Sequence, residues 1–522
     1  MNKPGHFFGF LVALGIAVFG LSLLLPSGKA ALGPFELGYY HPKDLLGPFW
    51  TGEQPEATDI EKGADPFGLD SIALEEEVVL DSSVVLEVRA LELAAEKARL
   101  AVPAAVLDTM IQVVDVRTFG PYFEALNALK SDPSAQVRVI HYGDSQLEGD
   151  RITMNLRDHL QKQYGGSGFG YVSLSPLVAP SSLNFKSVEG LSRKTVFGRR
   201  DTSIHDGKYG HLASFSQLEP SADSSGFAAE VDFAKRNWGY RLARDFTKVR
   251  MHLEGAAPVE VGVYVADTLY STRVFPSGEW TLGVDVPAVK AFSMRLSSAA
   301  PARIFGISFE SPSGVAVDNV AMRGASGMMF TKIDPLQLQE ALQREAYKLI
   351  IMQFGGNAVP YLRDQAHAKR FARAAGRQAG FVQRLYPDAA MLYIGPSDMA
   401  YKEGLNMQSY PLIKDLKSAM REEMLSRGVG YWDLYDVMGG EGSMVEWVEQ
   451  DPALAVKDYI HFTPKGASWV GKRLAAALEE LQKEYEMLQE ADWAKAELAK
   501  KKAAEQAAFT QATGAINDTT HE

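Results

Sequence analysis

Residues 137–146 read VRVIHYGDSQ, an apolar run that ends in a small residue, an acid and a serine. The run has the length and composition of a buried β-strand, and residues 152–160 then carry an apolar side chain at every fourth position, as one face of a helix does. The turn between them would present the Ser145 hydroxyl beside backbone N–H groups and the positive end of a helix dipole. An ordinary turn, with Asp144 or Ser145 as the helix N-cap, is the alternative explanation.

The same alternation of strand and helix returns in the second half of the chain. Repeated βα units are typical of a parallel sheet with helices on both faces. Together with residues 137–142, the sequence therefore predicts an α/β domain with five parallel strands. The further strands are predicted at 315–322, 349–354, 390–394 and 428–434, and the helices at 334–348, 361–385, 409–426 and 464–487.

Residues 176–313 follow a different pattern and interrupt the α/β domain. Short alternating runs, such as 249–253 and 259–265, are separated by Gly, Pro, Ser and Asp, and no long helical pattern lies between them. The segment is predicted to be an inserted all-β sandwich. It divides the α/β domain into 111–175 and 314–487.

The two ends of the chain have other compositions. Residues 7–25 form an uncharged apolar run of 19 residues within the segment 1–30. This length favours an uncleaved membrane helix, while the small residues at 27–31 leave a cleaved signal peptide open. Residues 31–110 are predicted to be a tether and a helical segment, and 488–522 an exposed helical or disordered tail.

The overall composition excludes several classes of protein. The 522 residues are 46% hydrophobic and 23% charged, which is typical of globular proteins, and the formal net charge is −12. Such an acidic chain lacks the basic face that nucleic acid requires. It contains no cysteine, which excludes disulfides, thiolate metal sites and a cysteine nucleophile. The ten histidines show no zinc-binding spacing, so no metal and no cofactor are expected.

A second segment, DYIH at 458–461, carries an acid and a histidine three positions apart. A serine hydroxyl is a poor nucleophile until a base takes its proton, and that base is commonly a histidine held in the useful tautomer by a carboxylate. Because Asp458 and His461 are three positions apart, their side chains can meet on one loop or helical turn. A surface acid and an isolated histidine are the alternative.

Two glycine-containing turns also follow predicted strands. In FGGN, residues 354–357, the Asn357 amide can donate to a developing oxyanion, and the glycines let the backbone approach a substrate closely. In RGASG, residues 323–327, the N–H of Gly327 is a second candidate donor. A plain left-handed turn is the alternative for FGGN, and a tight βα turn is the alternative for RGASG.

All four segments fall where open α/β sheets place their sites, at the carboxyl ends of parallel strands. Gly-Asp-Ser, then Gly327, Gly-x-Asn and Asp-x-x-His, in this order, resemble the GDSL/SGNH hydrolase family over residues 111–175 and 315–485. The resemblance implies a flavodoxin-like sheet of strand order 2-1-3-4-5. It implies that Ser145 is the nucleophile, His461 the general base and Asp458 its orienting acid. The implied oxyanion hole consists of the N–H groups of Ser145 and Gly327 and the Asn357 side chain, with Gly324 in place of Gly327 if the loop register differs.

The sequence departs from the family pattern at two positions. Gln146 replaces the leucine after the serine, and Ala358 replaces the more usual aspartate after Asn357. The extended turn and the inserted β-domain resemble the exported bacterial branch that acts on cell-envelope glycans. That branch includes peptidoglycan O-acetylesterases, some of which carry a carbohydrate-binding-like β-sandwich, and the resemblance implies the same for residues 176–313. Gln146, Gly356 and Asp398 are candidate substrate contacts, and a turn role is the alternative for Asp398.

These features predict a serine esterase that removes acetyl groups from an O-acetylated envelope polysaccharide. It would lie in the periplasm or another extracytoplasmic compartment, anchored by residues 7–25 or secreted. Two alternatives remain open. One is an acetyltransferase that passes the acyl group to a sugar hydroxyl and works with a membrane partner that exports acetyl groups. The other is a glycan-binding scaffold without activity.

Overall fold

The computed structural model describes residues 29–32, 35–38 and 110–489, except 199–200, 224 and 238. The chain divides into two units, Met1–Asp70 and Ser71–Glu522. In the first unit, β1 (Lys29–Leu32) and β2 (Phe35–Gly38) form an antiparallel hairpin.

The predicted membrane run 7–25 lies outside the described residues. So do most of the predicted tether 31–110 and nearly all of the tail 488–522. In the part of the chain that is described, no helix is both long and apolar enough to cross a membrane.

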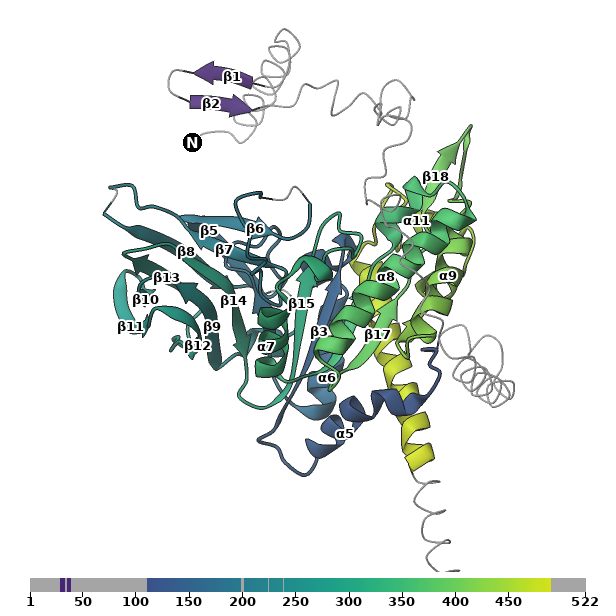
Figure 1. Cartoon of the computed structure of the whole chain (residues 1–522), viewed down its shortest axis with the longest axis horizontal. Coiled ribbons are helices and arrows are strands. Elements are labelled where there is room, and N and C mark those ends of the chain that lie inside the picture. The colour runs from purple at the N-terminus through teal and green to yellow at the C-terminus, as the bar shows by residue number, and fades with distance from the viewer. Residues whose placement is uncertain are drawn as a thin grey trace, which may run out of the picture. The chain divides into compact units, whose positions relative to one another are not determined.

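A five-stranded parallel sheet forms the core of the second unit (Figure 1). Its order is β15-β3-β16-β17-β20, and every neighbouring pair is parallel. In chain order this is 2-1-3-4-5, as the family resemblance implies. The apolar runs that predicted these strands form the buried interior of the sheet. The strands are β3 (Gln136–Gly143), β15 (Gly314–Ala321), β16 (Tyr347–Gln353), β17 (Ala390–Ile394) and β20 (Gly430–Trp432).

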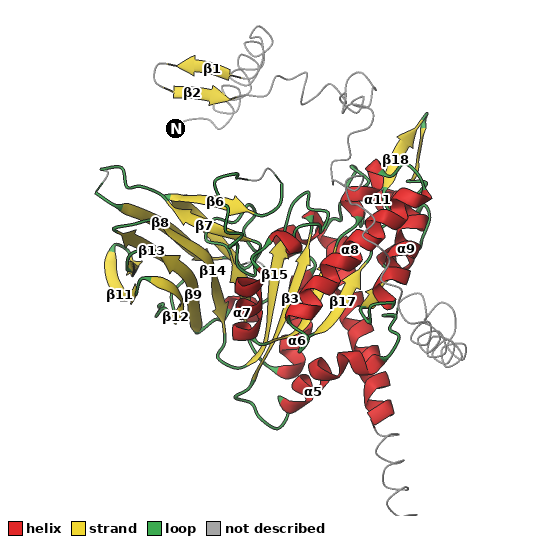
Figure 2. Cartoon of the chain, in the orientation of Figure 1, coloured by secondary structure: helices red, strands yellow, loops and turns green. Residues whose placement is uncertain are grey.

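Helices cover both faces of this sheet. The crossover from β3 to β15 runs in one direction across the sheet and the later crossovers run in the other, which puts their helices on opposite faces. One core cluster joins Val139 of β3 to Phe123, Leu156 and Leu478, so three helices share one face: α5 (Gly120–Ala128), α6 (Thr153–Tyr164) and the C-terminal helix 464–489. The other face carries α7 (Pro335–Glu345), α8 (Gln365–Leu385) and α9 (Ile413–Leu425) (Figures 1 and 2).

Between β3 and β15 the chain forms two antiparallel sheets that share one apolar core. The first has the order β11-β10-β13-β8-β5, and the second has the order β12-β9-β14-β7-β6, with β4 also paired to β14. Figure 2 shows these strands beside the helix-covered sheet. The strands of the first sheet are β5 (Leu183–Glu189), β8 (Phe227–Lys235), β10 (Val259–Val265), β11 (Thr268–Phe275) and β13 (Ala291–Ser298). Those of the second are β4 (Gly168–Val172), β6 (Leu191–Thr195), β7 (Ser214–Leu218), β9 (Lys248–Gly255), β12 (Gly278–Gly283) and β14 (Ala302–Glu310).

The β-structure begins earlier than the pattern at 176 indicates, because β4 already pairs with β14. The glycine-rich sequence of β4 conceals this strand. Gly168 and Gly170 have φ values of +87° and +83°, and a Cβ at Gly168 would lie 2.1 Å from the carbonyl oxygen of Phe309. Only glycine fits such a close backbone approach.

A buried charge network joins the two parts of this unit. Arg138 of β3 contacts Asp318 of β15, Glu310 of β14 and Glu345 at the end of α7. Arg250 of β9 binds Glu310 and Glu345 as well, at 3.0 and 2.6 Å. These buried guanidinium and carboxylate groups therefore connect the parallel sheet to the sandwich through contacts that are shielded from solvent.

Candidate active site

The nucleophile turn begins where β3 ends. Gly143 is required there, because a Cβ would lie 2.7 Å from a methyl carbon of Leu147 and 3.0 Å from the carbonyl oxygen of Gln353. Asp144 then caps the short helical segment η2 (Ser145–Asp150) by accepting the N–H of Gln146 at 3.0 Å. The capping role that was the alternative reading therefore belongs to Asp144, and the Ser145 hydroxyl is left to face another part of the chain.

That part of the chain is the loop between α11 (Ser443–Glu449) and the C-terminal helix. Ser145 Oγ lies 2.8 Å from His461 Nε2, although the two residues are 316 positions apart. His461 Nδ1 lies 2.7 Å from Asp458 Oδ2. The structure thus brings the three predicted residues into one hydrogen-bonded chain.

Asp458 is held as a carboxylate. Its Oδ1 accepts the backbone N–H groups of Ile460 and His461 at 2.9 and 3.0 Å. Partial burial would raise its pKa, but these bonds and the one from the His461 ring hold the pKa below its usual value. A carboxylate only accepts, so Nδ1 of His461 carries the proton and Nε2 is free to accept the serine hydroxyl.

Two side chains of the nucleophile turn fasten this histidine loop. Gln146 Nε2 donates to the carbonyl of Ile460 at 2.7 Å, and its Oε1 accepts the N–H of Phe462 at 3.4 Å. The amide thus binds the backbone on both sides of His461. Arg151 donates to the carbonyls of Ser145 and Phe462 at 2.7 and 3.2 Å. We call these two side chains the loop clamp.

The Asn357 side chain lies on the opposite side of the turn, in η5 (Gly356–Tyr361). Its Nδ2 donates to Asp144 Oδ2 at 3.2 Å and to the carbonyl of Ala325 at 3.1 Å. The amide nitrogen is therefore turned toward the nucleophile turn and the loop after β15, while Asn357 and Ser145 line the same pocket.

The loop after β15 holds the two candidate backbone donors. Gly327 has a φ of +87° and packs on Phe354, where a Cβ would lie 2.9 Å from the ring. Phe354 lines the serine pocket, so Gly327 lies directly behind its wall. Gly324 also has a positive φ, with open space at its Cβ position. Within the described residues, the N–H groups of both glycines have no hydrogen-bond acceptor.

Asp144 itself is a buried acid beside the nucleophile, a feature that the sequence reading did not assign to function. Burial raises its pKa to about 6, although the hydrogen bond from the N–H of Gln146 acts to lower it. Because its second oxygen accepts from Asn357, Asp144 connects the nucleophile turn to the candidate oxyanion donor. No sequence signal marks this contact, since the two residues are 213 positions apart.

The structure places two of the three candidate substrate contacts in the serine pocket and the third outside it. Gly356 and Gln146 line the serine pocket, together with Gly395, Pro396, Ser397 and Met399. Asp398 does not line it. Its side chain is fully buried, and Oδ2 accepts the N–H of Met444 at 2.9 Å and the hydroxyl of Ser409 at 3.0 Å. Asp398 therefore ties its loop to neighbouring segments, which corrects the substrate-contact prediction in favour of the turn role.

Comparison with known proteins gives matches among solved structures. No family model and no curated protein sequence matches the chain. Among solved structures, a peptidoglycan O-acetylesterase matches with a TM-score of 0.54 and 21% identity, over 70% of this chain and 96% of that chain. This likeness shows a shared fold.

Two other solved structures also match. A family two carbohydrate esterase from Clostridium thermocellum, in complex with cellohexaose, matches with 13% identity and a TM-score of 0.24, over 56% of this chain and 98% of that chain. A salicylyl-acyltransferase from a tetracycline biosynthetic pathway matches with 11% identity and a TM-score of 0.25, over 58% of this chain and 97% of that chain.

Proposed function

We propose that this chain, which has the fold of an SGNH hydrolase, is a serine esterase that removes O-acetyl groups from a cell-envelope polysaccharide such as peptidoglycan. The observation that carries the proposal is the hydrogen-bonded chain from Ser145 through His461 to Asp458, with heavy-atom distances of 2.8 and 2.7 Å. These are the distances that proton transfer from a serine nucleophile to its base requires.

The reaction follows from these contacts. His461 Nε2 takes the hydroxyl proton as Ser145 Oγ bonds to the acetyl carbon, and the imidazolium that forms is stabilised by the Asp458 carboxylate. The tetrahedral oxyanion is stabilised by the backbone N–H of Ser145, by the N–H of Gly327 or Gly324, and by Asn357. His461 returns the proton to the departing sugar oxygen. It then deprotonates the water that releases acetate from the acyl-enzyme.

A polysaccharide substrate is supported by the shared fold with a peptidoglycan O-acetylesterase over nearly all of that chain. An extracytoplasmic location is supported by the uncharged apolar run at 7–25, which is long enough to anchor the chain. In this proposal the envelope glycan is the partner, and the catalytic unit faces it from the outer side of the membrane.

The test is an assay of acetyl turnover by the purified chain. O-acetylated envelope oligosaccharides are supplied, and free acetate and glycan mass are followed together, with Ser145→Ala and His461→Gln in parallel. We expect acetate release that both substitutions abolish. Glycans that gain acetyl mass from an added acetyl donor would assign the transferase instead. Glycan binding by a folded wild-type protein without turnover would assign the inactive scaffold.

A further inference from the structure

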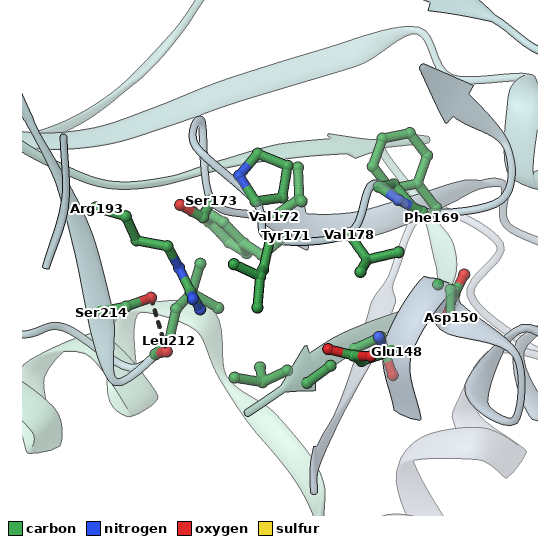
Figure 3. Close-up of a pocket in the computed structure, with 17 residues that line it drawn as sticks. Glu148, Asp150, Phe169, Tyr171, Val172, Ser173, Val178, Arg193, Leu212 and Ser214 are labelled. Carbon is green, nitrogen blue, oxygen red and sulfur yellow. Dashed lines mark hydrogen bonds between the residues drawn. The ribbon is translucent and has the colours of Figure 1, made fainter. Parts of the chain in front are cut away.

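A second pocket lies beside the serine pocket, between the nucleophile turn and the sandwich (Figure 3). The volume of this cavity is about 70 Å³. Its floor contains the buried rings of Phe169 and Tyr171, while Leu177 and Val178 are 58% and 42% exposed. An apolar rim of this kind suits the C–H face of a sugar ring.

The pocket is one strand away from the nucleophile. Its lining includes Ala321, which pairs in register with Gly143, two positions before Ser145. Neighbouring strands lie about 4.8 Å apart. The lining also includes Glu148 and Gly149 of η2, the same segment that begins with Ser145. The pocket is therefore near enough to Ser145 to receive a sugar or substituent next to an acetyl ester that reaches this residue.

Both acids that line the pocket already have cationic partners. Glu148 binds Arg323 through two hydrogen bonds of 2.6 and 2.8 Å. Asp150 is bound by both terminal nitrogens of Arg157. Their negative charges are thus balanced by arginines of the protein.

Arg193 of β6 is a cation that faces the same space, and among the described residues no carboxylate forms an ion pair or a hydrogen bond with it, although the charge of Glu148 acts on it. Figure 3 shows its side chain extending from its strand into the pocket, across from Glu148. Its Nε is buried without a hydrogen-bond partner in the described part of the chain, and its guanidinium carbon lies 5.7 Å from the centre of the Phe197 ring. A partly desolvated guanidinium with free donors is suited to a planar carboxylate, which it can bind through two parallel hydrogen bonds.

We propose that this pocket binds a carboxylate carried by the glycan beside the esterified sugar, with Arg193 as the anion-binding residue. The site makes the enzyme selective for an acidic polysaccharide over a neutral one. One guanidinium balances one carboxylate. Ser173 and Ser214 line the same pocket, where their hydroxyl groups can form hydrogen bonds with the hydroxyls of a sugar. This inference rests on the proposed esterase function and specifies, in addition, that the substrate carries a negative charge.

The test compares two substrates that differ in one charge. The first is an O-acetylated peptidoglycan tetrasaccharide with free lactyl carboxylates, and the second is the same compound with these groups converted to amides. For Arg193→Gln we expect KM for the acidic substrate to rise roughly tenfold or more. KM for the amidated substrate and turnover of 4-nitrophenyl acetate should stay unchanged. Arg193→Lys should restore part of the difference.

A matched control is Arg273→Gln, at an exposed position of β11 away from the pocket, which should leave both substrates unaffected. An equal loss on the acidic and the amidated substrate would make Arg193 structural, and no loss on either would remove the anion site. Calorimetry with the Ser145→Ala protein measures tetrasaccharide binding without turnover. Charge-selective binding that depends on Arg193 would therefore uphold the pocket even if the chain hydrolysed no ester.

Discussion

Asn357 donates both of its amide N–H groups in this structure, one to Asp144 and one to Ala325. One of these bonds must be exchanged for a bond to the oxyanion, and the amide is held between the two loops where that charge would form. Its neighbour Gly356 also lines the serine pocket. The residue is therefore placed to act on turnover more than on folding.

We expect Asn357→Ala to lower kcat by about 10²–10³-fold, the usual loss for one oxyanion donor, with little change in KM. Steady-state kinetics on 4-nitrophenyl acetate would measure this, and circular dichroism would check the fold. Near-normal turnover would remove Asn357 from the mechanism.

Asp144 gives a prediction that depends on pH. Its pKa is about 6 in the folded chain, against 3.8 as the ordinary value. Between these values the folded state holds the proton more tightly, so this group lowers the free energy of unfolding as the pH rises from about 4 to 6. Asp144→Asn removes that cost, and unfolding curves should favour the variant by about 2 kcal/mol more at pH 7 than at pH 4.

The same variant should lose activity. An asparagine at 144 can keep the bond to the N–H of Gln146 only by turning its own amide nitrogen toward Asn357. Two donors then face each other, and Asn357 must rotate away from its position. A pH-independent difference in stability, or unchanged kcat, would contradict the role given to Asp144.

At the scale of elements, the loop clamp holds the nucleophile turn against the histidine loop. We expect Gln146→Leu, which introduces the family's usual residue, to lower kcat by roughly tenfold, because two hydrogen bonds of about 0.5–1.5 kcal/mol each are lost. KM should change little, since the leucine keeps the side-chain volume. Stopped-flow or steady-state kinetics would separate the two constants.

Gln161→Leu is the matched control for the clamp. Gln161 is also buried, and its Nε2 donates to the carbonyls of Gly168 and Val315, away from the serine pocket. Its replacement should lower stability and leave kcat unchanged. Equal losses of kcat in both variants would mean that the Gln146 effect is a general loss of packing.

The sequence predicted the elements better than the contacts between them. The strands at 315–322 and 390–394 and the helices at 361–385 and 464–487 agree with the structure within a few residues, because periodic burial is a local property. The clamp could not be predicted, because Gln146 and Phe462 are 316 positions apart. The role of Asp398 was predicted wrongly for a related reason. Its burial against Ser409 and Met444 depends on how segments that are distant in the sequence pack together.

At the scale of the whole molecule, the buried network around Arg138 fixes the parallel sheet to the sandwich. Removing one partner of a buried ion pair leaves uncompensated charge and costs about 3–5 kcal/mol. Arg138→Met would remove the arginine that Asp318, Glu310 and Glu345 share, and would leave Glu310 with Arg250 and Glu345 with Arg250 and Arg344. We expect thermal unfolding to begin at a clearly lower temperature in this variant.

The control is Arg295→Gln, which removes the surface ion pairs with Glu230 and Asp267 on the sandwich and should shift the transition far less. If the two variants unfolded alike, the buried network would not be the main attachment between the two parts.

The strand order agreed with the family resemblance, and its physical basis is the right-handed crossover, which leaves few arrangements for five parallel strands. The attachment of the sandwich was not predictable from pattern. It depends on β4, which glycines conceal, and on charges that meet only in the folded chain. The membrane segment at 7–25 remains a prediction.

The central claim is that Ser145 carries the acyl group. The most direct measurement is peptide mass mapping of the purified chain, quenched in acid shortly after mixing with 4-nitrophenyl acetate. The account predicts one acetyl group on the peptide that contains Ser145, absent from Ser145→Ala and much reduced in His461→Gln. An acetyl group on another residue, or acetate release that persists in Ser145→Ala, would contradict it.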